Sequence, residues 1–438
     1  RVVGAARLRV MQSNGSAVGA QVARAEPVRT ILSGPAAGVA GAAALARSLG
    51  TDRFITFDMG GTSTDVSLFD RRARIRTLSH PDGYAVRTPV IDIHTVGAGG
   101  GSIARVDAGG SLRVGPESAG ADPGPACYGL GTLPTVTDAD LVAGRVVAAK
   151  FLGGKMKLDV VRAERAISGL ARALRTETVD AARGVIRVVN ANMERAIRVI
   201  TIERGFDPRE FALLAFGGAG PMHACELARD LGIGRIILPL HPGLLCAWGA
   251  LGAPRGREYS LTIRESGISY GGLLTRARPL VRRANKELRS EAGGRGRRIT
   301  HALWLDARYR GQSYELELKL TRDYIAQFHL LHRKTFGSSA LDAPVEVVNL
   351  RLRSAIDEPP VPLRRIGRAR GAPRSTARVS TLVGERMRQV PLYERESLGA
   401  GARFRGPAVV VEMSSTAYVA PEFAARVDEV GNLHLEIA

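Results

Sequence analysis

The chain has 438 residues, of which 45% are hydrophobic, so it can form two to three domains with their own cores. Its longest apolar runs, such as residues 244–253, are far shorter than the roughly 20 residues that span a bilayer, so we expect no membrane partner. The net charge of +20 would suit a nucleic-acid binder, but the arginines are spread along the chain and aromatic residues make up only 5%. We therefore expect no nucleic-acid partner.

Cysteine usage and the N-terminal composition bear on the compartment. Cys127, Cys225 and Cys246 are widely separated and match neither a disulfide framework nor a zinc spacing. The basic N-terminal stretch lacks a sustained apolar segment followed by a cleavage site. These features predict a cytoplasmic protein.

The first region, residues 1–52, is predicted to hold a short strand at 8–12 and an alanine-rich helix over about 36–49. Ser33 is a plausible helix cap, and Gly50 would end the helix. Because the chain begins in mid-pattern and without methionine, we expect this region to be the remnant of a junction with a preceding segment.

From residue 53 the pattern changes to closely spaced strands. Segments 54–58, 64–70 and 73–79 are short, β-rich and separated by turn residues, which predicts an antiparallel meander. Residues 96–134 are rich in glycine and proline, so we expect an ordered functional loop or a set of tight hairpins there.

Helices and strands then alternate. Apolar residues recur every three or four positions in 159–174 and 179–205, which predicts two helices. A buried strand over 211–218, a helix over 220–232 and a strand over 235–239 follow, and this order indicates a parallel crossover. We expect residues 53–254 to form one α/β domain around a mixed sheet.

Residues 255–438 are predicted to form a separate C-terminal α+β region. A helix is expected near 273–291, an antiparallel strand pair within 299–320, and further strands near 345–355 and 406–421. The basic stretch 364–374 contains proline and glycine and is interpreted as a solvated linker.

The stretch "FDMGGTSTD", residues 57–65, is the first motif with chemical meaning. Gly60 and Gly61 let the backbone turn sharply and approach a phosphate closely, and Thr62, Ser63 and Thr64 add hydroxyl donors. A carboxylate at the end of the preceding strand, Asp58, could hold the water shell of a magnesium ion. The alternative is an ordinary glycine-rich hairpin in which Asp58 and Asp65 only form the turn.

The second motif is "FGGAGPMHA", residues 216–224, which follows a buried strand and opens a helix. A helix N-terminus offers free amide groups to an anion, whereas the structural alternative is a close strand-to-helix crossing. The sequence lacks the Gly-Lys-Ser/Thr ending of a P-loop and the dinucleotide fingerprint. A phosphate turn between two strands is typical of the superfamily of actin, sugar kinases and heat-shock chaperones.

Long motifs in a constant order make the chain resemble the ATP-dependent hydantoinase and oxoprolinase family, specifically its A-type subunit. The resemblance covers nearly the whole chain. It rests on "FDMGGTSTDVSL", "VGAGGGSI", "GPESAGADPGPACYG", "TVTDADLVAGR", "AFGGAGPMHA" and "DARYRGQSYEL".

The resemblance implies an actin-like, ribonuclease-H-like ATPase half that uses ATP and Mg²⁺ to phosphorylate the carbonyl of a small cyclic amide. A B-type subunit would then complete the hydrolysis in a hetero-oligomer. Phosphoryl transfer needs positioning and charge neutralisation more than covalent chemistry. The catalytic candidates are Asp58, which would anchor the magnesium, and Asp65, which would brace the loop or orient a water. The remaining implied contacts are with the phosphates, through Gly60, Gly61, Thr62, Ser63 and Thr64, and with the adenosine, through Gly217, Gly218, Ala219 and Gly220.

Three further residues and one loop are candidates for a functional role, but the sequence patterns around them are less specific. His94 and His223 could contact substrate or a metal, but no second ligand lies at metal spacing beside either, and a structural role is the alternative for both. The "VGAGGGS" loop, residues 96–102, could form an anion-binding nest or a crossing point between chains. Cys127 lacks a recognisable base partner, which argues against a thiol nucleophile.

The chain also departs from the family pattern. Family members resemble two actin-like halves, and the first half is missing here, so we expect these residues to supply one wall of a nucleotide cleft and to need an N-terminal half as a partner. Two other functions stay open. One is a subunit of an ATP-dependent acetone- or acetophenone-type carboxylase, and the other is a non-catalytic, truncated scaffold paralogue.

Overall fold

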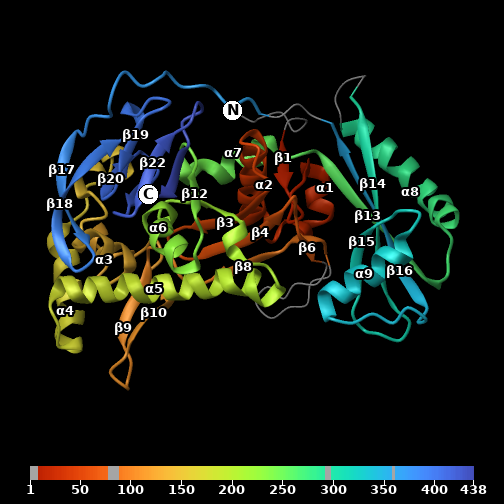
Figure 1. Ribbon diagram of the computed structural model, residues 1–438, viewed down its shortest axis with the longest axis horizontal. Helices are drawn as coiled ribbons and strands as arrows, with labels where there is room; N and C mark the ends of the chain where they lie inside the picture. Colours follow the sequence, from red (N-terminus) through yellow and green to blue (C-terminus); the bar gives the residue numbers. More distant parts are fainter. Residues whose placement is uncertain (1–7, 77–87, 292–296, 358–360) are drawn as a thin grey trace. The chain divides into compact units, whose positions relative to one another are not determined.

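The computed structural model describes residues 8–76, 88–291, 297–357 and 361–438, and the chain divides into two compact units (Figure 1). The smaller unit combines Arg1–Ser33 with Ala253–Pro360, and the larger unit combines Gly34–Gly252 with Val361–Ala438. This division differs from the boundaries at 53 and 255 that the sequence predicts. The difference arises because segments far apart in sequence pair with each other within each unit.

In the described part of the chain, the larger unit contains a nine-stranded mixed sheet. Strands β3 (Arg53–Met59) and β4 (Thr64–Asp70) form an antiparallel hairpin, and β8 (Ile93–Val96) continues it antiparallel to β4. Strands β11 (Ala212–Phe216) and β12 (Arg235–Leu238) run parallel to β3. The expected hairpin and parallel crossover are thus confirmed. In spatial order the strands are β19 (Arg403–Arg405), β22 (Phe423–Val427), β23 (Leu433–Ile437), β12 (Arg235–Leu238), β11 (Ala212–Phe216), β3 (Arg53–Met59), β4 (Thr64–Asp70) and β5 (Arg72–Ala73), with β8 (Ile93–Val96) also on β4.

The third strand of the meander differs from the prediction. Only β5 from the segment 73–79 pairs with β4, whereas β6 (Ile75–Arg76) pairs with β7 (Val90–Ile91) in a separate ribbon. Residues 77–79 lie outside the described residues. Since β8 occupies the edge of β4 from Thr64 to Ser67, only the far end of β4 is left for β5.

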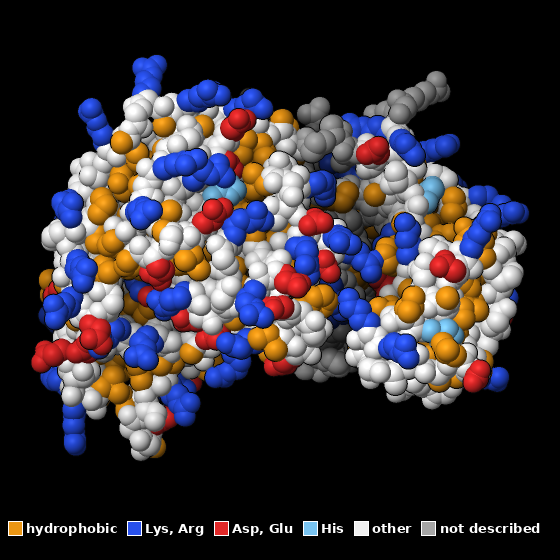
Figure 2. Space-filling view, viewed as in Figure 1, with side chains coloured by type: hydrophobic (Ala, Val, Ile, Leu, Met, Phe, Trp, Pro, Cys, Tyr) orange, Lys and Arg blue, Asp and Glu red, His pale blue; other side chains and the backbone are white. Residues whose placement is uncertain are grey.

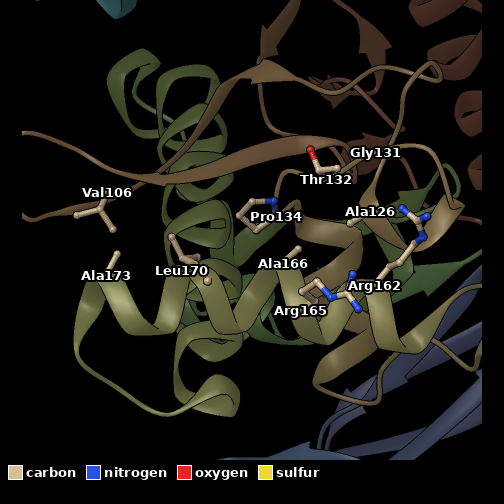
Figure 3. A pocket seen from close by; sticks show the side chains of 11 residues that line it. Val106, Ala126, Gly131, Thr132, Pro134, Arg162, Arg165, Ala166, Leu170 and Ala173 are labelled. Atoms are coloured by element: carbon tan, nitrogen blue, oxygen red, sulfur yellow. The ribbon is translucent and has the colours of Figure 1, made fainter.

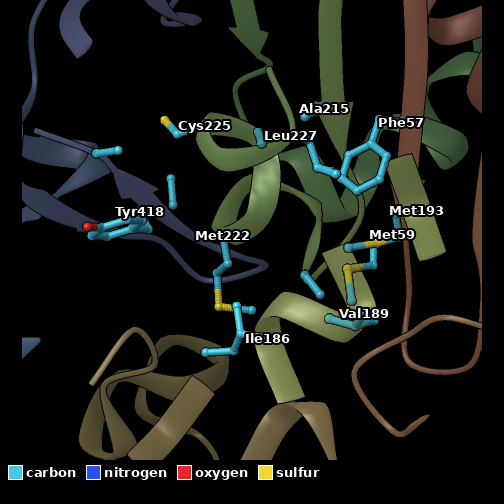
Figure 4. Close-up of a cluster of buried hydrophobic side chains, with 14 of the residues drawn as sticks. Phe57, Met59, Ile186, Val189, Met193, Ala215, Met222, Cys225, Leu227 and Tyr418 are labelled. Atoms are coloured by element: carbon cyan, nitrogen blue, oxygen red, sulfur yellow. The ribbon is translucent and has the colours of Figure 1, made fainter. Parts of the chain in front are cut away.

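Helices pack on both faces of the main sheet. On one face, α5 (Thr178–Ile200) and α6 (Gly220–Leu231) cover β3, β4, β8 and β11. Figure 4 shows part of this core, where Phe57 and Met59 lie with Val189 and Met193 of α5 and Met222 of α6. On the other face, α2 (Ser33–Ser48) and α7 (Leu245–Gly252) contact strand residues such as Phe54 and Phe216.

The helices expected from periodicity are present. Helix α4 (Val160–Leu174) begins after its cap Asp159, and α5 continues through a 3₁₀ turn to Gly205, whose φ is 76°. Helix α2 includes Ser33 rather than beginning after it. Helix α3 (Val136–Val142) was not predicted, although its capping box between Thr135 and Asp138 is well formed.

The glycine- and proline-rich region is an ordered structure, as expected. It contains the hairpin β9 (Ser102–Val106) and β10 (Leu112–Ser118), which protrudes below α5 in Figure 1. Backbone hydrogen bonds tie the flanking loops to neighbouring segments; for example, Ala104 N–H donates to the Pro134 carbonyl over 2.8 Å.

The smaller unit is built on a four-stranded antiparallel sheet, counted over the described residues, with helices α8 (Tyr270–Glu291) and α9 (Tyr324–Phe336) packed on it. The helix near 273–291 and the strand pair within 299–320 are confirmed, and α9 was not predicted. The strand order is β13 (Gly256–Ser266), β16 (Val345–Ile356), β14 (Ile299–Tyr309) and β15 (Leu316–Lys319). The chain start adds β1 (Arg9–Met11), β2 (Ala17–Gly19) and α1 (Ala20–Ala25).

The last part of the chain returns to the larger unit. Residues 364–374 contain no helix or multi-residue strand, in keeping with the linker interpretation. The strands that follow form a second sheet of four strands within the described residues: β17 (Ala377–Val383), β18 (Arg386–Glu394), β20 (Ala408–Val411) and β21 (Thr416–Val419). No helix in the parts of the chain that the structure describes has the length and apolar character of a membrane span.

Candidate nucleotide site

The register of the main sheet brings the two glycine turns together. Strands β3 and β11 are parallel neighbours, and Asp58 at the end of β3 is the in-register partner of Phe216 at the end of β11. The turn after β3 and the turn after β11 therefore leave the sheet side by side at the carboxyl ends of their strands. Asp65, the second residue of β4, is the cross-strand partner of Asp58.

Gly217 lies at the contact between the two turns. Its φ is 82°, a left-handed value that favours glycine. A β-carbon there would lie 2.3 Å from the Met59 carbonyl oxygen and 2.5 Å from Oδ1 of Asp58. The Ala219 N–H donates to the same Met59 oxygen over 3.1 Å, which ties the two turns together. Glycine at position 217 therefore allows the turn after β11 to approach the end of β3 closely.

Gly218 and Gly220 differ from Gly217 in what surrounds them. Gly218 is exposed, and the nearest atom to a β-carbon there would be the Ser414 carbonyl oxygen at 3.8 Å. Gly220 is buried in the first turn of α6, where a β-carbon would be 3.4 Å from the Phe57 carbonyl oxygen. Gly218 is thus the member of this turn that presents open backbone to a ligand.

The turn after β3 directs its amide groups outward. The carbonyl oxygens of Gly60 and Gly61 accept hydrogen bonds from the N–H groups of Gly100 and Gly101, over 3.0 and 2.6 Å. Since the C=O and N–H of one planar trans peptide point in opposite directions, these bonds turn the N–H groups of Gly61 and Thr62 away from the glycine loop. Gly61 and Thr62 are exposed.

These amide donors are unused within the chain. Among the residues that the structure describes, the N–H groups of Gly61, Thr62 and Ser63 have no intramolecular hydrogen-bond partner. Consecutive free N–H groups form a concave donor surface that suits a phosphate. An ordinary two-strand hairpin would not need a second loop to fix its carbonyl groups in this way.

The "VGAGGGS" loop supplies that second loop. A β-carbon on Gly99 would lie 2.6 Å from the carbonyl carbon of Thr62, so only glycine allows the two backbones to approach this closely. The Gly99 N–H donates to Ser102 Oγ over 2.8 Å, and the N–H groups of Gly100 and Gly101 hold the turn. Because these three amides are engaged within the chain, the loop supports the turn after β3 and does not form an anion-binding nest.

The hydroxyl groups of the first motif have different environments. Thr64 is fully buried, and its hydroxyl donates to the Ala98 carbonyl oxygen over 2.5 Å. It therefore anchors the loop instead of facing outward. Thr62 and Ser63 are the hydroxyl groups of this turn that reach the surface.

Two carboxylates flank the turn, and both have raised pKa values. Burial raises the pKa of Asp58 to about 6; the Cys246 thiol, which donates to its Oδ2 over 3.2 Å, lowers it, and the charge of Asp65 raises it further. Burial also raises the pKa of Asp65, against a hydrogen bond from the Thr95 hydroxyl. In the described part of the chain neither carboxylate pairs with a lysine or arginine.

The carboxylates of Asp58 and Asp65 fit a magnesium ion that would also be held by phosphate and water. Two neighbouring carboxylates without a cationic partner repel each other, and a divalent cation would relieve that repulsion. Mg²⁺ typically takes one or two carboxylates and completes its shell with waters and substrate phosphates. Within the described ranges there is no cluster of three or more His, Cys, Asp or Glu side chains that could hold a metal by themselves.

The family follows from a match to the hydantoinase/oxoprolinase family model over residues 1–257. The chain belongs to the hydantoinase/oxoprolinase family. It is 34% identical over 441 residues to the caprolactamase subunit alpha of Pseudomonas jessenii, across 96% of this chain and 63% of that subunit. The family assignment expected from the motifs is thereby confirmed.

Two solved structures support the same assignment. The ATP-dependent caprolactamase from Pseudomonas jessenii superposes with a TM-score of 0.85 at 33% identity, and covers 98% of this chain and 65% of its own. A nucleotide-free acetone carboxylase, described as catalysing ATP-dependent acetone carboxylation, gives a TM-score of 0.79 at 25% identity over 98% of this chain and 64% of its own. This hydantoinase/oxoprolinase family member thus spans less than two thirds of the relatives it matches.

In this family member, His94 lies away from the two turns. It is opposite Val66 in the β4–β8 ladder, whereas its neighbour Thr95 contacts Asp65. Because successive side chains of a strand point to opposite faces, His94 and Asp65 lie on different faces of the sheet. Burial lowers the pKa of His94, and the charges of Arg204 and Arg76 lower it further.

His223 is also separated from the turns, although it follows the second one closely in sequence. It is fully buried in α6; its Nδ1 lies 2.8 Å from Asn190 Oδ1 and its Nε2 lies 3.4 Å from Asp140 Oδ2. Asn190 also donates to Glu226 over 2.7 Å, and Glu226 pairs with the buried Arg145. His223 thus belongs to a polar network inside the core.

Three neighbours of the site were missed by the sequence analysis. Cys246 of α7 contacts Asp58, Thr95 of β8 contacts Asp65, and Ser415 donates to the Gly218 carbonyl oxygen over 3.1 Å. Cys246 and Ser415 are more than 180 residues away from the residues they contact. No local pattern marks them, because their positions depend on how distant strands and helices pair.

Proposed function

We propose that this chain is the ATP-using part of a ring-opening amidohydrolase of the hydantoinase/oxoprolinase type. It phosphorylates the carbonyl oxygen of a small cyclic amide, and a B-type partner subunit in a hetero-oligomer completes the hydrolysis. The observation that carries the proposal is the turn at residues 60–63. Its free N–H groups point outward beside a pair of unneutralised carboxylates and an open glycine backbone.

The residues of the chain have separate tasks in this reaction. The N–H groups of Gly61, Thr62 and Ser63 bind phosphate oxygens, and the hydroxyls of Thr62 and Ser63 add further donors. Asp58, with its neighbour Asp65, would hold Mg²⁺, and the ion would supply positive charge against the phosphates. The exposed backbone at Gly218 borders the adenosine.

The proposed reaction consumes one ATP and two water molecules for each ring that is opened. The amide oxygen attacks the terminal phosphorus of ATP, the bond from that phosphorus to the bridging oxygen breaks, and ADP leaves. The O-phosphorylated ring carbon is far more electrophilic than the amide, so water adds to it, and the tetrahedral adduct collapses by breaking the C–N bond to give a ring-opened acyl phosphate with a free amine. A second water then hydrolyses the acyl phosphate, which releases inorganic phosphate and leaves the carboxylate of the ring-opened product. The chain accelerates the first step by positioning and charge neutralisation.

The strand order supports an actin-like half. Strands β8, β4 and β3 are antiparallel, and β11 and β12 continue the sheet parallel to β3. We propose that the opposite wall of the nucleotide cleft comes from an N-terminal half. The relatives are longer than this chain, which spans 63% of caprolactamase subunit alpha. ATP binding by the 438 residues alone is then expected to be weak.

The decisive experiment measures lactam-stimulated ADP release. The chain is combined with an N-terminal half and a B-type subunit, and ATP turnover is followed with hydantoin, 5-oxoproline and caprolactam. We expect one of them to stimulate turnover, and Asp58→Ala to abolish that stimulation, while Asp107→Ala in the exposed β9–β10 hairpin leaves it unchanged. Unchanged turnover in Asp58→Ala would favour the scaffold interpretation instead.

The similarity to acetone carboxylase favours one second candidate, a subunit of an ATP-dependent ketone carboxylase. The same turn and carboxylates would then serve the phosphorylation of a ketone or of bicarbonate. The assay distinguishes the two by adding acetone or acetophenone with bicarbonate in place of the lactam. ADP release that depends on ketone and bicarbonate, and not on any lactam, would select the carboxylase.

A further inference from the structure

A cavity unrelated to the two glycine turns opens on the larger unit. Its volume is about 460 Å³, and it lies between α4 and the chain segment 126–134 (Figure 3). Cavities of this size are typical of sites for small molecules. None of its lining residues belongs to either turn.

One side of the cavity is apolar. Val106 from β9, Pro134, and Ala166, Leu170 and Ala173 from α4 form this wall. In Figure 3, Val106 and Ala173 lie at the opposite end from the charged side chains. A ligand that fills this end must therefore carry a hydrocarbon part.

The other end is cationic. Arg162 and Arg165 line it from successive turns of α4, with Thr132 facing them. Arg162 contacts Asp159 through an ion pair of 3.6 Å, with both side chains nearly half exposed, so its charge is only partly offset. Among the described residues Arg165 has no ion pair or hydrogen bond. The cavity thus has an uncompensated guanidinium at one end.

The cavity wall is held rigidly from behind. The buried carboxylate of Asp138 accepts the N–H groups of Ala126 and Thr135, over 3.1 and 3.0 Å, and that of Cys127 over 2.8 Å. Ala126 lines the cavity, and Thr135 directly follows the lining residue Pro134. Because one fixed carboxylate holds both ends of the segment 126–134, the cavity is formed before any ligand binds.

We propose that this cavity binds a small amphipathic carboxylate. The hydrocarbon part lies against Leu170, Pro134 and Val106, and the carboxylate pairs with the guanidinium of Arg165, assisted by Arg162. A planar guanidinium matches a carboxylate in a two-bonded arrangement, and the apolar wall selects against inorganic anions. The assignment is independent of the ATP chemistry and is tested by binding alone.

The test is calorimetric titration of the full chain with hexanoate, with acetate, hexan-1-ol and inorganic phosphate as matched probes. We expect hexanoate to bind, and acetate, which lacks the tail, and hexanol, which lacks the charge, each to bind at least about tenfold more weakly. Arg165→Ala should weaken hexanoate about tenfold or more. Arg172→Ala, on the same helix but outside the cavity, should leave hexanoate binding unchanged.

Two results would overturn the proposal. One is hexanoate affinity that is the same in Arg165→Ala, in Arg162→Ala/Arg165→Ala and in the unmodified chain. The other is phosphate or acetate binding as tightly as hexanoate, since the apolar wall would then have no part in recognition. Chemical-shift changes confined to the α4 side chains of the cavity, in a methyl-labelled sample, would support the assigned location.

Discussion

Gly217 lies so close to Asp58 that a β-carbon on the glycine would be 2.5 Å from Oδ1 of the carboxylate. The contact joins the end of β11 to the end of β3, and so joins the proposed adenosine side of the site to the proposed metal side. The identity of residue 217 thus controls both the backbone path of the second turn and the position of the carboxylate.

Gly217→Ala is therefore expected to be costly. The substitution forces an alanine to a φ of 82° and places its methyl group against Met59 and Asp58. We expect a loss of about 2–4 kcal/mol in the free energy of unfolding, measured by urea denaturation. Gly218→Ala is the matched control, because its β-carbon meets nothing closer than 3.8 Å. Equal stability of the two variants would contradict the close contact.

Gly99→Ala tests the contact between the loop at residues 96–102 and the turn at residues 60–63. A methyl group there would lie 2.6 Å from the Thr62 carbonyl carbon and push the turn away from the loop. We expect ATP-dependent turnover of the reconstituted complex to fall by about tenfold or more, because displaced amides no longer converge on one phosphate. Gly109→Ala, in the exposed hairpin between β9 and β10, should keep full turnover. A fully active Gly99→Ala would show that the loop does not position the turn.

Asp58→Asn separates stability from function. Burial raises the pKa of Asp58 from 3.8 to about 6, so the folded chain retains a proton that the unfolded chain releases as pH rises. This group therefore reduces the free energy of unfolding between about pH 4 and pH 6, and the reduction is complete above that window. The asparagine variant should be more stable than the parent at pH 8 by about 1–3 kcal/mol and equal to it near pH 4, while losing ATP turnover.

The same pKa gives a pH dependence of ATP turnover in the parent. Magnesium binding needs the ionised carboxylate, so turnover should fall as pH drops through about 6. Raising the Mg²⁺ concentration should move the midpoint to lower pH, because metal and proton compete for the same oxygens. A midpoint that does not respond to Mg²⁺ would assign the titration to another group.

His223→Ala tests whether this histidine acts in the core or at the site. Its Nδ1 pairs with Asn190 Oδ1, and its Nε2 lies 3.4 Å from the buried Asp140 carboxylate, whose oxygens have no hydrogen-bond partner within the described residues. Removing the imidazole leaves Asn190 Oδ1 unpaired and empties a fully buried position, so we expect a loss of about 2–4 kcal/mol in the free energy of unfolding. Arg172→Ala, on the exposed side of α4, is the control. Lost turnover with unchanged stability would instead place His223 in the reaction.

The local sequence is enough to predict the parts of the site that lie within one short stretch of the chain. The turn between Met59 and Thr64 could be predicted because glycines, hydroxyls and a flanking carboxylate lie within one short stretch. The second turn at Gly217 could be recognised in the same way, but its contact with Asp58 depends on the parallel register of β3 and β11. The approach of Cys246 to Asp58 depends on how α7 packs against the sheet. No residue pattern around either position predicts it.

The division into two units also could not be predicted from local sequence patterns. The segment after residue 361 has ordinary strand patterns, and nothing in them distinguishes pairing with a neighbour in sequence from pairing with β12. Helix α9 was missed because the buried face that holds Tyr324 and Phe328 continues with a polar residue, His332. Burial of polar side chains depends on tertiary partners, which no periodicity reveals.

The pairing of β12 with β23 has a practical consequence for anyone dissecting this protein. Ile236 and Ile237 of β12 are hydrogen-bonded to a strand from the C-terminus, through partners Leu435 and His434. A recombinant piece ending near residue 254 would expose that strand as an open, hydrophobic edge able to recruit other molecules. The turn at residues 60–63 can therefore be produced in monodisperse form only in a polypeptide that also contains β23.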